Sequence, residues 1–281
     1  MSDCQKAHGG SVVDVVTKSL LKEFAQSQKI ESDQESEQFE AFINYVVVAD
    51  VYPEEFDFGA VSTGKGEFGL DGIAIIVNDI LLDDEEQAED LIEHSPVLQI
   101  QFLFLQAKTS SSFDAGDMSK FFQAVLDFFK IESAFAQNER ILELQRIKNR
   151  LYEAAAKFTR GLPKLGMYFA TTGTWTNDKN LSAIRDGFLA QAGSLHIFAD
   201  ASFSPIDAAR IQKLYFQTKN AFRVTISFPN NLPLPEIPNV RESYIGLLPL
   251  SEYLKVISDD GGNIRRRLFS ITSAIFKVIH R

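Results

Sequence analysis

The sequence predicts an α/β protein in which a mixed sheet is flanked by helices and followed by a second, smaller α/β unit. Two observations support this fold class. Apolar runs of strand length, at residues 71–77 and 98–108, lie between segments whose apolar residues recur at helical spacing. After Gly161-Leu162-Pro163, which interrupts this pattern, strand-like and helix-like segments continue to alternate. We therefore expect one domain over residues 1–160 and another over residues 161–281.

The chain begins with two predicted amphipathic helices, at residues 11–29 and 35–48. In the second helix, Glu40 lies on the edge of the apolar arc, in line with Ile43 and Val47. Its carboxylate then points toward the protein or into a cleft beside it. An ordinary boundary glutamate with its head group in water explains the same spacing equally well.

The first predicted strand follows a loop at residues 50–68, which contains Pro53 and several glycines. An acidic segment, residues 83–93, separates the two apolar strands and predicts a solvated helix capped by Asp83. The remaining elements are expected as helices at 116–131, 137–159, 178–192, 204–217 and 250–258, strands at 165–173, 194–199 and 222–228, a proline-rich connector at 230–239, and a last strand within ESYIGLLPL.

Composition excludes several classes of protein. The 281 residues carry a formal net charge of −10, which argues against a protein that coats nucleic acid non-specifically. There is no uninterrupted apolar stretch of about 18 residues, so no membrane span is expected. The segment MSDCQKAHGG lacks the features of a secretion signal, and Cys4, the single cysteine, allows no internal disulfide. These features favour a cytoplasmic protein.

Three polar residues lie at the ends of the two apolar strands. Asp71 begins the first strand, and Gln106 and Lys108 project from the same face at the end of the second. If the two strands are antiparallel neighbours, the start of one lies beside the end of the other. The three side chains then converge at one edge of the sheet.

This set of residues suits phosphodiester hydrolysis with a divalent metal. Mg²⁺, or Mn²⁺ in its place, prefers oxygen ligands, which Asp71, Gln106 and Glu40 can supply. Lys108 would stabilise the charge on the scissile phosphate, and Glu40 would be a second ligand or a base that positions water. The alternative interpretation is structural, because Asp is common at strand starts and Lys at strand exits to solvent.

Four segments resemble the AIPR family, named for abortive infection and phage resistance. They are FEAFINY, GLDGIAIIVN, FLFLQAKTSSSF and YIGLLPLSEYLKVISDDGGNIRRRLF, in the expected order. The first three are similar to the family's N-terminal part, which has a PD-(D/E)xK nuclease fold of the Mrr-like, restriction-endonuclease-like type, with Gln in place of the second acid. The resemblance places Glu40, Asp71, Gln106 and Lys108 at the motif positions. It implies a magnesium-dependent nuclease in bacterial antiphage defence, with DNA the favoured substrate and RNA an alternative.

The chain also departs from this family. The spacing from Asp71 to Gln106 is longer than in a compact nuclease hairpin, and the residues after RRRLF do not resemble the family's, so the chain looks C-terminally truncated. Two other classes therefore stay open: a non-catalytic nucleic-acid-binding or regulatory module with a degenerate nuclease fold, and a toxin-like interaction protein acting through the second domain. A homo-oligomer is an open alternative to a monomer.

Overall fold

The computed structural model describes residues 15–32, 34–52, 56–64, 69–219, 224–235 and 243–258, together with residues 262 and 264. The chain divides into two compact units. Unit 1 comprises residues 1–52 and 56–218, and unit 2 comprises residues 53–55 and 219–281. Each unit is described by itself.

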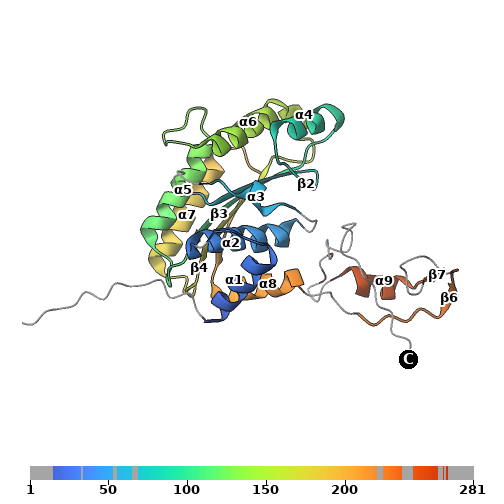
Figure 1. Ribbon diagram of the computed structural model, residues 1–281. Helices are drawn as coiled ribbons and strands as arrows, with labels where there is room; N and C mark the ends of the chain where they lie inside the picture. Colours follow the sequence, from blue (N-terminus) through green and yellow to red (C-terminus); the bar gives the residue numbers. More distant parts are fainter. Residues whose placement is uncertain are drawn as a thin grey trace, which may run out of the picture. The chain divides into compact units, whose positions relative to one another are not determined.

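The core of unit 1 is a five-stranded sheet with the order β2-β1-β3-β4-β5 (Figure 1). β1 is antiparallel to both β2 and β3, whereas β3, β4 and β5 are parallel to one another. The sheet is therefore mixed and its parallel part is connected by helices, which confirms the predicted α/β class. The strands are β1 (Gly72–Val77), β2 (Ile80–Leu81), β3 (Ile100–Lys108), β4 (Lys164–Thr171) and β5 (Asp200–Ile206).

The sheet continues across residue 160, where the sequence analysis placed a domain boundary. β4 pairs with β3 over the whole length from Gln101↔Lys164 to Lys108↔Thr171. Leu165, Met167 and Phe169 pack into the same apolar cluster as β1 and β3. Residues 161–218 are thus part of the first sheet, and the structure divides the chain at residue 218 instead of at residue 160.

Helices cover both faces of the sheet, and strand alternation decides which residues contact which helices. Phe102 and Phe104 of β3 pack on one side, which we call the α5 face, whereas Leu103 and Leu105 pack on the other, which we call the α2 face. Figure 1 shows α5, α6 and α7 on one side of the sheet and α1, α2 and α8 on the other. The helices are α1 (Val15–Ser27), α2 (Glu35–Val51), α3 (Phe58–Val61), α4 (Glu85–His94), α5 (Ala115–Phe128), α6 (Glu139–Glu153), α7 (Lys179–Ser194) and α8 (Ala208–Lys219), with a 3₁₀ turn at Ala155–Lys157.

Two predicted elements of unit 1 differ from the structure. The segment 194–199, expected as a strand, is the end of α7 and the turn that follows, and the strand is β5, six residues later. β5 was missed because it is an edge strand, mostly half exposed, whose sequence DASFSPI interrupts its apolar residues with Asp and Ser and contains a proline. The acidic helix is present as α4, but its N-cap is Asp84, whose side chain accepts a hydrogen bond from the backbone N–H of Gln87 at 2.9 Å.

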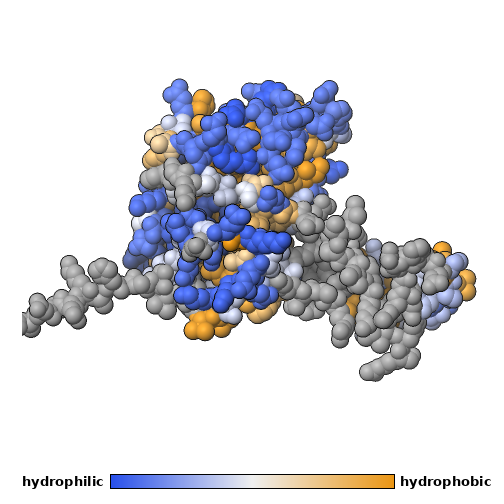
Figure 2. All heavy atoms as spheres, in the orientation of Figure 1, coloured by the Kyte–Doolittle hydropathy of each residue, from blue (hydrophilic) through white to orange (hydrophobic). Residues whose placement is uncertain are grey.

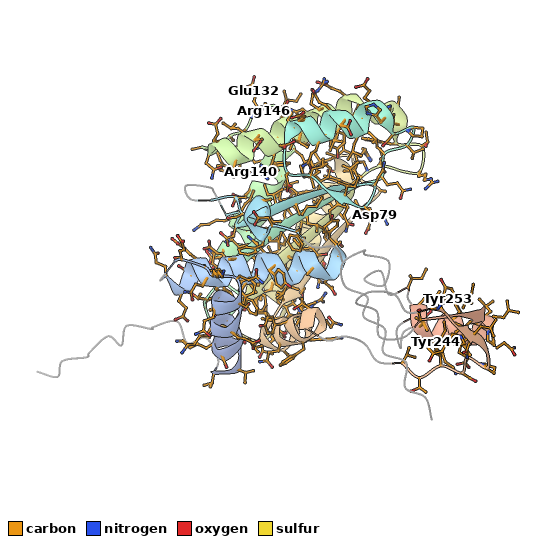
Figure 3. The ribbon with its side chains drawn as sticks, turned by 45° about the vertical axis from the view of Figure 1, so that its right-hand side comes forward. Asp79, Glu132, Arg140, Arg146, Tyr244 and Tyr253 are labelled. Carbon is orange, nitrogen blue, oxygen red and sulfur yellow. The ribbon has the colours of Figure 1, made fainter. Side chains whose placement is uncertain are left out.

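Arginines of α6 contact the acidic helix α4 and the residues that precede it. Arg146 pairs with Glu85 at 3.1 Å, and Arg140 donates to the carbonyls of Ala60 and Asp83 (Figure 3). The surface over α4 and α6 is largely hydrophilic in Figure 2. Such partly exposed pairs contribute little individually, about 0 to 1 kcal/mol each, so the buried apolar cluster, not the ion pairs, accounts for the packing of α6 on the sheet.

Unit 2 contains a two-stranded antiparallel sheet of β6 (Asn230–Pro233) and β7 (Tyr244–Leu247), followed by α9 (Leu250–Ile257). β6 occupies the segment expected as a proline-rich connector. The strand expected at 222–228 lies partly outside the described residues, and its described part, 224–228, has no regular structure. The last strand and the last helix follow the prediction.

None of the described helices combines the length and the apolar character that crossing a membrane requires.

Lys148 of α6 is a buried cation within this fold. Its side chain is 3% exposed. Its ammonium group donates a hydrogen bond to the backbone carbonyl of Phe128 at 2.8 Å and lies 5.4 Å from the centre of the Phe128 ring. Burial lowers the pKa of Lys148 from 10.5 to about 8. At neutral pH the protein therefore folds with a charge that is costly to bury.

Because the charged form of Lys148 is costly to bury, the free energy of unfolding should depend on pH. Between pH 8 and 10.5 the unfolded chain binds a proton at Lys148 that the folded protein has released, so the free energy of unfolding should rise with pH across this window. Urea unfolding of the wild type and of Lys148→Met at pH 7.5, 9 and 10 would measure this. The wild type should gain stability relative to Lys148→Met as the pH rises, and a constant difference would contradict the assignment. Lys120→Met, at an exposed position of α5, serves as the control.

Candidate functional site

The structure brings Asp71 and Gln106 into direct contact. Asp71 immediately precedes β1, and its backbone N–H donates to the carbonyl of Leu105 on β3 at 2.9 Å. Because the two strands are antiparallel neighbours, the start of β1 lies beside the end of β3, as the sequence analysis required. The Gln106 side-chain amide donates a hydrogen bond to Asp71 Oδ2. The two side chains are 7% and 1% exposed, respectively.

A second donor fixes the Asp71 carboxylate. The backbone N–H of Ala107 donates to the same oxygen, Asp71 Oδ2, at 2.7 Å. Hydrogen bonds accepted by a carboxylate are stronger than those between neutral groups, and they fix the orientation of the carboxylate. Asp71 thus ties the beginning of β1 to the end of β3 by its side chain as well as by its backbone.

Lys108 is the last residue of β3 and is half buried. By strand alternation it projects from the same face as Gln106, the α5 face. It pairs in register with Thr171, the last residue of β4. Asp71, Gln106 and Lys108 therefore lie at one end of the sheet, at the start of β1 and the carboxyl end of β3.

Glu40 comes from the other side of the sheet. It is partly buried on α2, whose Phe39, Phe42 and Ile43 pack in the apolar cluster of the α2 face. It lies one helical turn before Asn44, whose side-chain amide donates to the backbone carbonyl of Asp71 at 3.0 Å. The helix that carries Glu40 is therefore anchored at the start of β1.

Asn44 is a residue that the sequence analysis missed. It is 1% exposed, and it occupies an otherwise apolar stretch of α2. A buried polar side chain within FINYVVV is a signal in the sequence, because such a residue needs a hydrogen-bond partner. Gly72 completes this contact, since a Cβ atom there would lie 2.3 Å from Asn44 Oδ1. Asn44 positions Asp71 by a hydrogen bond to the Asp71 backbone carbonyl. Residue 72 must be a glycine to leave room for the Asn44 side chain.

The loops that follow β3 and β4 are joined next to Lys108. The backbone N–H of Thr172 donates to the carbonyl of Ser110 at 3.0 Å, and the Thr172 hydroxyl donates to the same carbonyl at 2.9 Å. Gly173 packs so closely that a Cβ atom there would lie 2.2 Å from the carbonyl oxygen of Ser111. The serines after Lys108 are thus held by the β4 loop.

The side chains at this end of the sheet offer the type of ligand atom, oxygen, that a hard divalent cation prefers. The carboxylate of Asp71 and the amide oxygen of Gln106 are ligands that Mg²⁺ accepts, and Glu40 would add a second carboxylate. Binding would replace the Gln106–Asp71 hydrogen bond, because the amide must turn to present its oxygen. Within the part of the chain that the structure describes, no three His, Cys, Asp or Glu side chains are gathered closely enough to hold a metal ion.

Comparisons of the chain with family models, with curated proteins and with solved structures find no match.

Proposed function

We propose that unit 1 is a divalent-metal-dependent nuclease that hydrolyses phosphodiester bonds, with DNA as its substrate, in bacterial antiphage defence. The observation that supports the proposal is the hydrogen bond between Gln106 and Asp71 at the end of the sheet from which Lys108 also projects. The resemblance of four segments to the AIPR family supports the same function, and the single cysteine, Cys4, is in keeping with a cytoplasmic location. The net charge of −10 is compatible with it, because a bound cation reverses the local field.

The residues would divide the chemistry as follows. Asp71 and Gln106, with Glu40, would hold Mg²⁺ or Mn²⁺, which when bound lowers the pKa of water and neutralises phosphate charge. Lys108 would face the phosphate oxygens that gain charge as water attacks phosphorus in line. The bond from phosphorus to the leaving oxygen then breaks, and that oxygen takes up a proton. Glu40 would orient the attacking water.

One observation favours a second candidate, a non-catalytic nucleic-acid-binding or regulatory module. The hydrogen bonds from Gln106 and Ala107 to Asp71 Oδ2 already join β1 to β3. This arrangement can stabilise the fold without any metal. In that case Asp71 and Gln106 would be a structural pair in a degenerate nuclease fold.

Metal binding and cleavage distinguish the two candidates. Wild type and Asp71→Asn are incubated with supercoiled plasmid and with single-stranded RNA, in Mg²⁺, Mn²⁺ or EDTA, and Mn²⁺ binding is followed by electron paramagnetic resonance. We expect the wild type to bind Mn²⁺ and to cleave plasmid only with metal, and Asp71→Asn to lose both properties. Absence of cleavage, with Mn²⁺ binding equal in the two proteins, would reject the nuclease in favour of the binding module. Preferential cleavage of RNA would correct the substrate.

A further inference from the structure

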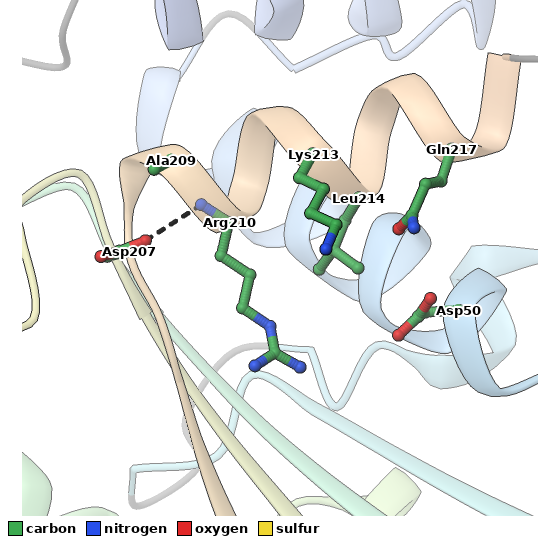
Figure 4. A pocket seen from close by; sticks show the side chains of 7 residues that line it. All are labelled: Asp50, Asp207, Ala209, Arg210, Lys213, Leu214 and Gln217. Atoms are coloured by element: carbon green, nitrogen blue, oxygen red, sulfur yellow. Dashed lines mark hydrogen bonds between the residues drawn. The ribbon is translucent and has the colours of Figure 1, made fainter. Parts of the chain in front are cut away.

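A cavity of about 480 Å³ lies between the C-terminal part of α2 and helix α8, within unit 1 (Figure 4). Five of its lining residues carry polar or charged side chains: Asp50, Asp207, Arg210, Lys213 and Gln217. Its volume falls within the range of about 300 to 1,000 Å³ that is typical of small-molecule sites. It lies on the α2 face, whereas Gln106 and Lys108 project from the α5 face. Glu40 is also on α2, but it precedes Asp50 by ten residues, which is about 15 Å along the helix. The cavity is therefore distinct from the candidate nuclease site.

Helical spacing gathers three of these residues on one side of α8. Arg210, Lys213 and Gln217 follow one another at intervals of three and four residues, which places them along one face of a helix. Figure 4 shows their side chains directed into the space between the two helices, with Asp50 of α2 opposite. Arg210 and Lys213 form a cationic side of the cavity, and two carboxylates also line it: Asp50 on the opposite side, and Asp207, which accepts a hydrogen bond from the backbone N–H of Arg210 at 3.0 Å.

The two cations lack the partners that other arginines in this acidic protein have. Arg140, Arg146 and Arg185 each form an ion pair with a neighbouring carboxylate. Arg210 and Lys213 form no ion pair with any carboxylate among the described residues. Like charges one turn apart on a helix repel each other. An anion bound between them would relieve this repulsion.

Tyr168 of β4 links the two sides of the cavity electrostatically. It projects from the α2 face, where it packs against the apolar cluster that includes Leu214. Burial raises the pKa of Tyr168, the Asp50 carboxylate raises it further, and the Arg210 guanidinium lowers it. The raised pKa keeps the phenol protonated at neutral pH.

We propose that this cavity binds a phosphate monoester that carries a hydroxylated sugar, that is, a sugar phosphate or a nucleotide. The phosphate contacts Arg210 and Lys213, which match it in charge and, for the guanidinium, in bidentate geometry. The sugar hydroxyls donate to Asp50, a group that would repel a bare phosphate, and contact Gln217. The site is independent of the nuclease proposal and requires no metal.

Titration calorimetry with the full chain in EDTA tests the site with three probes: ribose 5-phosphate, ribose and inorganic phosphate. Ribose 5-phosphate should bind at least about tenfold more tightly than either of the others, because only it uses both sides of the cavity. Arg210→Gln and Lys213→Gln should each weaken its binding by about tenfold or more. Lys120→Gln, which removes the same charge from α5 on the opposite face, should leave binding unchanged.

Asp50→Asn tests the acceptor side separately. It should strengthen the binding of inorganic phosphate and reduce the preference for ribose 5-phosphate over phosphate. Asp50, Lys120, Arg210 and Lys213 are exposed, so circular dichroism and thermal unfolding of their variants should match the wild type. Equal affinity of the wild type for phosphate and ribose 5-phosphate, no binding of either, or binding that is insensitive to Arg210→Gln and Lys213→Gln would each overturn the proposal. Lys108→Ala should bind ribose 5-phosphate like the wild type, whatever the outcome for nuclease activity.

Discussion

Replacing Lys108 with Ala should lower the rate of metal-dependent cleavage by about 100- to 1000-fold, the range found when one charge-stabilising donor is removed from an active site. Lys108 stands at the end of β3, on the face shared with Gln106. Its side chain is half buried, so alanine removes the packing of its methylene stem as well as its charge. The larger effect is expected on catalysis, with a loss of unfolding free energy of about 1 kcal/mol.

The measurement is the single-turnover cleavage rate of plasmid DNA, together with Mn²⁺ affinity and urea unfolding. Lys164→Ala provides the matched control, because Lys164 is also a terminal strand residue but begins β4, at the opposite end of the sheet. It should cleave like the wild type. If Lys108→Ala keeps the full rate while Asp71→Asn loses it, Lys108 has no catalytic role. If both variants keep it, the site is elsewhere.

Replacing Gly173 with Ala should destabilise unit 1 by about 2 to 3 kcal/mol, the cost of forcing an extra methyl group into a packed position. The added Cβ would lie 2.2 Å from the carbonyl oxygen of Ser111, and the obstruction is backbone, which a change of rotamer cannot remove. The β3 loop must then move away from the β4 loop. Because this loop begins directly after Lys108, the variant should also lower the cleavage rate.

Replacing Gly187, in the same unit, should change the free energy of unfolding in the opposite direction. It lies in the middle of α7, and a Cβ atom there would meet nothing within 4 Å. Gly187→Ala should therefore stabilise the protein by about 0.5 to 1 kcal/mol, because alanine loses less backbone entropy in a helix. Urea unfolding of both variants beside the wild type measures the two effects. Equal stability of Gly173→Ala and the wild type would show that the two loops are not locked together.

Local sequence patterns predicted the central strands because these segments are buried on both faces and read as continuous apolar runs. β1 and β3 were located in this way, and so were the amphipathic helices on either side. β5 was missed for the opposite reason. It lies at the edge of the sheet, and only its pairing with β4 makes it a strand. The apolar residues of 194–199, which suggested a strand, instead lie in the turn that follows α7.

The candidate site was predictable in part. Asp71, Gln106 and Lys108 were identifiable as polar residues at the ends of apolar strands, and the antiparallel pairing of β1 with β3 brings the first two into contact. The support that the site receives from Asn44 was not predictable, because periodicity identifies a buried position but not the partner of a polar side chain there.

The sequence by itself determined the α/β class, the helices and buried strands of the core, and the residue types at the ends of β1 and β3. Those properties depend on side-chain alternation and helical spacing, which are local. The tertiary structure alone decided that residues 161–218 complete the first sheet, and that an open cavity lies between α2 and α8, with Asp50 on one side and Lys213 on the other. These arrangements depend on hydrogen bonds and packing between segments far apart in the chain, which no local pattern encodes.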